Sequence, residues 1–183
     1  SDFDFTLTVT RERITKHGDY RMPTRNGEPH RISVNGTLNK YAFLLTFIHE
    51  VAHMHAFEKY GRRIQPHGKE WKRTFRNIAK PFLKEKVWPK DISEILYNYF
   101  INPKASSAGD INLTRILRKY DDNTDLYLED LTEGSYFAVN NEKGRQFLKG
   151  KKRRTRYLCT ELASNKIFTI HGMAKIHKIE VNE

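Results

Sequence analysis

The sequence predicts an α+β fold, with helices in its first part and short strands in its last third. Three observations support this fold class: one long apolar segment with helix-capping residues at both ends, a second amphipathic segment after it, and three β-rich segments separated by turn residues. A chain of 183 residues suits one or two domains and can bury about 70% of its unfolded surface. The pattern therefore predicts helices with their own core, followed by a smaller β-module.

The longest predicted helix begins after Asn39. The run 41–48 is apolar, and the apolar pattern continues to Tyr60. Asn39 is a suitable N-cap, and Gly61 supplies a C-terminal stop. We therefore expect a buried helix of about twenty residues, which can hold functional side chains rigidly.

The middle of this helix carries the motif His49-Glu50-Val51-Ala52-His53. Histidines four residues apart project from one helix face, roughly 6 Å apart along the axis, and can bind one Zn²⁺. Glu50 points beside such a metal, where its carboxylate can take a proton from water. Five residues alone are a weak signal, but their place inside a predicted buried helix favours a catalytic metal site.

A catalytic zinc needs a third protein ligand and an open fourth position. The metzincin arrangement would require Gly at 56 and His at 59, but the chain has Ala56 and Lys59. The next histidine is His67, just before a second predicted helix that starts near Lys69. One face of that helix is apolar, with Trp71, Phe75, Ile78 and Phe82. We favour His67 as the third ligand, and Glu70 is the alternative.

These motifs together resemble the SprT-like family of SprT/Spartan-type zinc metallopeptidases. The resemblance is carried by 49–53, by Tyr60-Gly61-Arg62 and by 66–72, and it covers about residues 3–100. It implies a minimal zincin-like metallopeptidase domain, in which a β-hairpin within residues 11–35 leads to the metal helix.

The resemblance also implies the roles of individual residues. His49, His53 and His67 would hold one zinc ion, and Glu50 would be the catalytic base. The expected activity is hydrolysis of peptide bonds, with proteins on DNA or crosslinked to DNA as substrates. Two alternatives stay open: a DNA-binding module with a structural or idle zinc site, and a zinc hydrolase that is not a peptidase. The presence of Glu50 argues against an idle site.

Histidines and tyrosines outside the motif are weaker candidates for a catalytic role. His17 and His30 flank the expected hairpin, and one of them could approach the site and stabilise an oxyanion, although a turn or surface role is more common. Tyr41 and Tyr60 lie at the two ends of the metal helix. Either could donate to a transition state.

A linker-like stretch at 104–109, after Pro103, predicts the domain boundary. We expect a metallopeptidase domain over 1–103 and a second, basic domain over 110–183. The second domain should open with a short amphipathic helix at 110–120. Strands are predicted at 135–139, 155–159 and 166–170; their expected core is Tyr136, Phe137, Tyr157, Leu158, Phe168 and Ile170.

Many members of the family end in a zinc ribbon built on two cysteine pairs. This chain has one cysteine, Cys159, so a four-cysteine site is excluded. We expect a β-module that resembles a zinc ribbon without its cysteines, with Cys159 as a buried apolar residue.

The chain carries a net charge of +11 with a pI of about 9.7, which favours polyanionic partners, DNA first and an acidic membrane surface second. The densest basic block is 143–156. Its candidate phosphate-binding residues are Lys149, Lys151, Lys152, Arg153, Arg154 and Arg156. Phe147 and Tyr157 could stack on bases; the alternative is a solvated turn.

The lengths of the apolar runs and the cysteine count indicate the cellular compartment. No apolar run reaches the roughly 18 residues that a membrane span needs, and a single cysteine is typical of a reducing compartment. We expect a cytoplasmic protein, associated with the nucleoid if it binds DNA, and no membrane partner.

Overall fold

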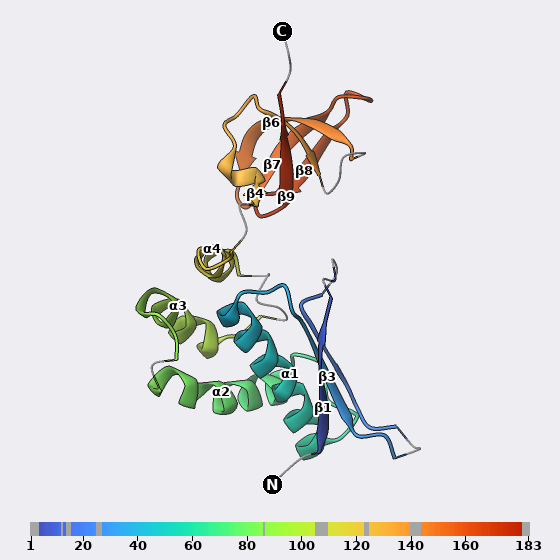
Figure 1. Ribbon diagram of the computed structural model, residues 1–183, viewed down its shortest axis with the longest axis vertical. Coiled ribbons are helices and arrows are strands. Elements are labelled where there is room, and N and C mark those ends of the chain that lie inside the picture. The colour runs from blue at the N-terminus through green and yellow to red at the C-terminus, as the bar shows by residue number, and fades with distance from the viewer. Residues whose placement is uncertain are drawn as a thin grey trace. The chain divides into compact units, whose positions relative to one another are not determined.

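The computed structural model describes residues 4–180 except 12, 14–15, 25–26, 86, 105–109, 123–124 and 140–143. The chain forms two compact units, Ser1–Asp122 and Asn123–Glu183. Within the described residues there are four α-helices and two β-sheets (Figure 1), which confirms the α+β class. None of these helices is long and apolar enough to cross a membrane.

The first unit opens with a three-stranded sheet. Its strands are β1 (Phe5–Thr10), β2 (Gly18–Arg21) and β3 (His30–Asn35), in the order β1-β3-β2. The central strand β3 pairs parallel to β1 and antiparallel to β2, so β2 and β3 form the expected hairpin. Ile32 and Val34 of β3 are buried and form a core with Met54 of the following helix. This packing holds the edge strand β2 beside that helix.

Helices form the rest of the first unit. Their bounds are Lys40–Tyr60 for α1, Lys69–Lys84 for α2, Lys90–Ile101 for α3 and Ile111–Arg118 for α4. The ends of α1 confirm the sequence prediction. The Asn39 side chain accepts hydrogen bonds from the backbone N–H groups of Tyr41 and Ala42, as an N-cap should. Gly61 follows the helix with φ of 76°, a conformation that favours glycine.

The helix α4 belongs to this helical core rather than to the second unit. Leu113, Ile116 and Leu117 of α4 pack in one cluster with α1, α2 and α3. The Asn39 amide also donates to the Leu117 carbonyl oxygen at 2.9 Å. The two units therefore divide after Asp122, later than the expected boundary at 103–110. The linker residues 105–109 lie outside the described part of the chain.

The second unit is one antiparallel sheet. Its strands are β4 (Leu126–Tyr127), β5 (Tyr136–Val139), β6 (Gln146–Arg153), β7 (Arg156–Glu161), β8 (Ile167–His171) and β9 (Lys175–Ile179), and the 3-10 turn Leu128–Asp130 follows β4. The order is β4-β9-β5-β6-β7-β8, so the last strand returns to pair with β5. This sheet is larger than the three strands expected.

The core of this sheet differs in part from the expected one. Its buried members include Leu128, Phe147 and Ile176 beside the expected Phe137 and Tyr157. The side chains of Phe168 and Ile170 are only partly buried against it. Cys159 is buried, as predicted for an apolar residue.

Candidate metal centre

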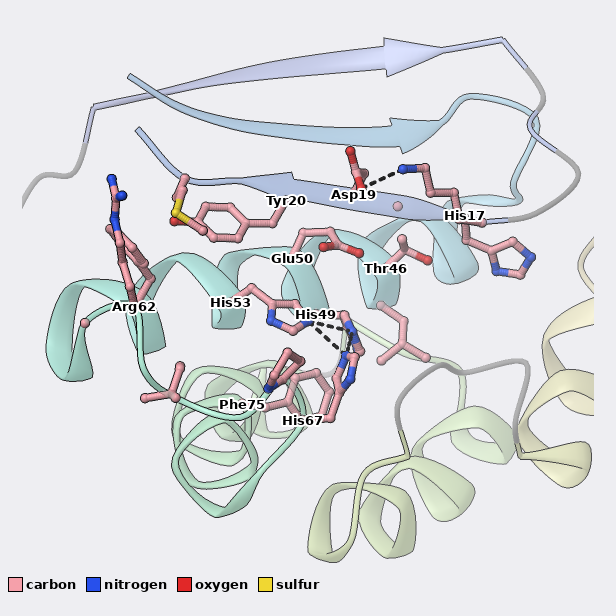
Figure 2. Close-up of a pocket in the computed structure, with 18 of the residues that line it drawn as sticks. His17, Asp19, Tyr20, Thr46, His49, Glu50, His53, Arg62, His67 and Phe75 are labelled. Carbon is pink, nitrogen blue, oxygen red and sulfur yellow. Dashed lines mark hydrogen bonds and ion pairs between the residues drawn. The ribbon is translucent and has the colours of Figure 1, made fainter. Parts of the chain in front are cut away.

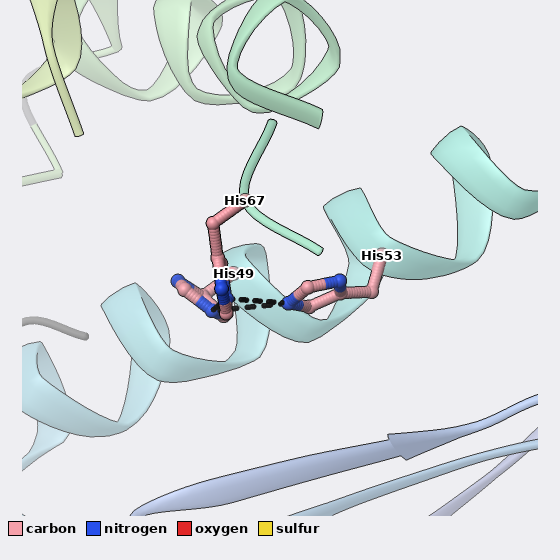
Figure 3. Close-up of side chains that lie close together, drawn as sticks. All are labelled: His49, His53 and His67. Carbon is pink, nitrogen blue, oxygen red and sulfur yellow. Dashed lines mark hydrogen bonds between the residues drawn. The ribbon is translucent and has the colours of Figure 1, made fainter. Parts of the chain in front are cut away.

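Three histidine side chains converge beside the middle of α1 (Figure 3). The Nε2 atoms of His49 and His67 are 3.0 Å apart, those of His53 and His67 also 3.0 Å, and those of His49 and His53 3.2 Å. Histidines 49 and 53 share a helix face because four residues make little more than one turn. Within the described residues, this trio is the cluster of histidine, cysteine and acidic side chains that could hold a metal ion.

Hydrogen bonds among the three Nε2 atoms cannot satisfy all of them at once. In a neutral imidazole each nitrogen is either a donor or an acceptor, so three nitrogens in mutual contact leave at least one pair mismatched. A tetrahedral zinc site, with Zn–N distances of about 2.0–2.1 Å, places its ligand nitrogens roughly 3.3 Å apart. The observed separations of 3.0–3.2 Å are close to that spacing. The donor set therefore fits a zinc ion with three imidazole ligands.

The loop between α1 and α2 brings His67 to this point. His67 has φ of 58°, an uncommon backbone conformation for a residue other than glycine that often marks a functional constraint. The Trp71 side chain, fully buried in the first turn of α2, packs against all three imidazoles with ring centroids 4.5, 5.1 and 4.8 Å away. Glu70, the alternative ligand, lies outside the histidine cluster, with its carboxylate 3.8 Å from the ammonium of Lys69.

Burial keeps the histidines of α1 neutral. Together with a smaller effect of the neighbouring imidazoles, it lowers the pKa of His49 to about 3 and that of His53 to about 4. Burial also lowers the pKa of His67. Only the neutral imidazole has a lone pair to offer to a metal. The site is therefore in its metal-binding form at neutral pH.

Glu50 lies beside the cluster in the same pocket. Its side chain is buried, and this burial raises its pKa to about 7, with a smaller contribution from Asp19. The backbone N–H of Tyr20 donates to the carboxylate. A Cβ atom at Gly18 would lie only 2.6 Å from Oε1 of Glu50. Strand β2 can therefore approach the carboxylate this closely because residue 18 has no side chain.

The histidines and Glu50 line a cavity of about 580 Å³ between β2, α1 and the loop before α2 (Figure 2). His17 also lines this cavity, whereas His30 does not. Tyr41 packs against Trp88 and Tyr120 and is not part of the cavity lining, and neither is Tyr60. Neither tyrosine is therefore placed to donate at this site.

Several lining residues were missed by the sequence interpretation. They are Gly18, Asp19, Tyr20, Arg62 and Tyr99. Those on β2 could have been suspected, because an edge strand that follows His17 directly must place alternate side chains on the helix side. Arg62 directly follows Gly61, the residue that ends the metal helix. Tyr99 comes from α3, and no local pattern connects it to the motif.

The candidate phosphate-binding residues divide into two groups. Lys151, Lys152, Arg153, Arg154 and Arg156 are exposed on the β6–β7 hairpin. Lys149 is only 4% exposed, and its ammonium donates to the Leu131 carbonyl oxygen at 2.5 Å. Lys149 is thus unavailable to phosphates, contrary to the prediction. Lys143, where the basic block begins, lies outside the described residues.

The expected base-stacking residues are core residues. Phe147 is 4% exposed and Tyr157 9% exposed. Phe147 stacks on Phe137, with ring centroids 5.6 Å apart. Neither ring presents a face for a base, so the prediction of stacking is wrong for this conformation.

Two histidines one turn apart on a buried helix, a third from the following loop and a carboxylate in the same pocket are typical of zinc-metallopeptidase-type domains. Residues 5–92 match the family model described as the SprT-like family, so this part of the chain is similar to that family. No curated protein and no solved structure is significantly similar to the chain.

Proposed function

We propose that the chain is a zinc-dependent metallopeptidase of the SprT-like type, with a minimal zincin-like domain in its first unit. The observation that carries this proposal is the convergence of the three Nε2 atoms, 3.0–3.2 Å apart, beside a buried carboxyl group. His49, His53 and His67 would hold the ion and leave a fourth position facing the cavity.

Zinc bound at this site would polarise the scissile carbonyl and acidify water. Glu50 acts as the base that takes the proton of the attacking water, and then as the acid that gives it to the leaving amine. A carboxyl group whose pKa is near 7 can do both near neutral pH. The backbone N–H of Tyr20 donates to this carboxylate, and the missing side chain at Gly18 leaves room for it.

The test combines metal analysis with proteolysis. The purified chain should contain about one zinc per molecule and should cleave an unfolded protein substrate. Glu50→Gln should keep the zinc but lose cleavage by at least about 10²–10⁴-fold, because an amide cannot accept the proton. Glu70→Gln is the matched control, since Glu70 lies outside the histidine cluster, and it should retain activity.

The outcome also separates the alternatives. A chain that holds zinc but cleaves neither proteins nor peptides would support an idle site or another hydrolase, and amide or ester substrates would then be tested. Cleavage by metal-replete Glu50→Gln would remove Glu50 from the mechanism.

We also infer that the β6–β7 hairpin binds nucleic acid through phosphates, which would bring the peptidase to DNA-associated proteins. The observation in favour is a run of exposed cations at one hairpin end, Lys151, Lys152, Arg153, Arg154 and Arg156. Their side chains offer charge but no aromatic face, so sequence preference should be slight.

A salt titration of DNA affinity tests this inference. Changing Lys151, Lys152, Arg153 and Arg154 to Ser should weaken binding and flatten its salt dependence, by roughly 0.9 in log–log slope for each lost contact on duplex DNA and 0.7 on single strands. The control changes four exposed cations of α2 to Ser, namely Lys69, Arg73, Arg76 and Lys80. Equal losses in both variants would mean that net charge alone drives binding.

A further inference from the structure

The charged side chains that line the cavity beside the three histidines differ in whether they form ion pairs. Lys16 and Asp19 pair with each other, with Nζ and Oδ1 2.6 Å apart. Asp19 also accepts from the guanidinium of Arg21 at 3.0 Å. Glu50 lies beside the histidine cluster. Of the two cationic side chains among the described residues that line this cavity, Lys16 is paired with Asp19, and Arg62 has no ion-pair partner.

Arg62 lies at one end of the cavity. In Figure 2 it is drawn at the Tyr20 end, while His17 and Thr46 lie at the opposite end. The cavity lining also includes Phe57, whose ring centroid lies 6.4 Å from that of Tyr20, together with Ile64, two residues after Arg62, and Met22, two residues after Tyr20. Met22 is 43% exposed, so it can still contact a ligand. This end of the cavity thus combines an apolar wall with one unpaired cation.

The wall is held in place by a chain of hydrogen bonds. The Tyr20 hydroxyl contacts Nδ1 of the buried His30 at 3.0 Å, and Nε2 of His30 lies 3.0 Å from the carboxylate of Glu58. The Tyr20 ring is parallel to that of His53, at an interplanar angle of 3°. Because His30 is bound on both sides, Tyr20 is a fixed surface between the histidine cluster and the Arg62 end.

The distance between the histidine cluster and Arg62 corresponds to a few residues of an extended peptide. His53 and the end of α1 at Tyr60 are seven residues apart, roughly 10 Å along the helix axis. Extended chain covers about 3.3 Å per residue. A group bound at Arg62 therefore belongs to a residue within about three positions of the bond over the histidines.

We propose that Arg62 and the Tyr20 wall form a substrate subsite that selects a carboxylate, either the side chain of a glutamate or the C-terminal carboxylate of the substrate. The guanidinium presents a planar set of donors that matches a carboxylate, and the apolar wall packs against the methylene groups or the backbone before it. The subsite rests on the proposed peptidase function and specifies its substrate class.

Matched peptides test the subsite. One series, with amidated C-termini, carries Glu or Gln at each of three positions on either side of the cleaved bond. A second series carries Gln throughout and ends in either a free or an amidated carboxyl group. The ratio of kcat/KM for the acidic peptide over its neutral partner is measured for the wild type, Arg62→Gln and Arg62→Glu. Arg63→Gln is the control, because this neighbouring exposed arginine does not line the cavity.

The wild type should prefer an acidic peptide by about tenfold at one position, the usual size for a hydrogen bond to a charged group. This ratio should fall to about one in Arg62→Gln, fall below one in Arg62→Glu because like charges repel, and persist in Arg63→Gln. The series that shows the effect identifies the source of the carboxylate. A ratio near one in the wild type, or an equal ratio in Arg62→Gln, would overturn the subsite.

Peptide binding separates this proposal from the peptidase function. Fluorescence anisotropy of labelled peptides on zinc-loaded Glu50→Gln should show the same acidic preference without cleavage. Loss of that preference on adding Arg62→Gln would support the subsite. If, in addition, no variant cleaves a peptide, the proposed peptidase function is wrong but the subsite stands. Equal binding of acidic and neutral peptides would count against the subsite whatever the activity.

Discussion

The two units of the chain treat their buried polar side chains in opposite ways. In the β-module, Lys149 donates to the Leu131 carbonyl oxygen, and Glu161 accepts from both Arg145 and Ser164. In the helical unit, three imidazoles meet without a consistent set of hydrogen bonds, and Glu50 is buried at the cost of a raised pKa. Buried polar groups without suitable partners, in an otherwise well-packed fold, are expected at functional sites. The comparison therefore favours the helical unit as the place of the proposed chemistry.

The largest expected effect concerns the third histidine. Mutating a residue that hydrogen-bonds to a metal ligand typically lowers metal affinity by about 10–100-fold. Removing a ligand itself should lower the affinity for zinc by more than that. His67→Ala should therefore lose zinc at stoichiometric concentrations, whereas Glu70→Ala should keep it. Metal analysis after gel filtration measures both. Loss of zinc from Glu70→Ala alone would reverse the ligand assignment.

The next prediction tests whether the units are independent. Phe137 is fully buried in the module, so Phe137→Ala should destabilise that unit by about 3–5 kcal/mol. Hydrogen exchange should increase over residues 126–179, while zinc content stays the same. Trp71 and Trp88 both lie in the helical unit, and their fluorescence should still report its unfolding at the wild-type temperature. A matching fall in that temperature would show that the two units unfold together.

A third prediction uses the pH dependence of the zinc-free helical unit. Since burial raises the Glu50 pKa from 4.5 to about 7, the folded state holds this proton where the unfolded state has released it. The burial of Glu50 therefore does not destabilise the folded state below pH 4.5. The destabilisation grows between pH 4.5 and 7 and is complete above pH 7. Glu50→Gln should therefore stabilise the zinc-free protein at pH 8 by about 3 kcal/mol or less.

The measurement is urea unfolding followed by tryptophan fluorescence, with a chelator, at pH 4.5 and pH 8. The lowered pKa values of His49 and His53 act in the opposite direction, because the unfolded state gains their protons as the pH falls. They are present in both proteins, so the difference between the two isolates Glu50. An equal difference at both pH values would contradict the prediction.

The smallest effect compares two lysines of β6. Lys149→Met should cost about 1–3 kcal/mol, because it leaves the Leu131 carbonyl oxygen without its donor. Lys151→Met, at an exposed position, should change stability by less than about 0.5 kcal/mol but weaken DNA binding. Thermal unfolding followed by hydrogen exchange in the module measures the first effect, and anisotropy the second. Equal stability of the two variants would mean that Lys149 is not bonded as described.

The sequence-based predictions were most accurate where all the residues of a pattern lie in one helix. The cap at Asn39, the stop at Gly61 and the spacing of His49 and His53 all follow from the geometry of a single helix. These predictions were less accurate for strands. Strand β9, with the alternation Lys175-Ile176-His177, was missed because only Ile176 is buried in the core. The helix α4 was expected as an amphipathic segment, but its partner could not be read from its own residues.

By itself, the sequence determined the metal helix, the chemistry of its side chains and the absence of a four-cysteine site, because these depend on residue identity and on the fixed period of an α-helix. Only the tertiary structure decided that β2 places Gly18 against Glu50, that α4 joins the first core and that Lys149 points inward. The last of these depends on pairing between β6 and β7, whose register shifts between Lys149 and Lys152. Such contacts join residues distant in sequence, and a strand's period of two allows either face to be buried until its partners are in place.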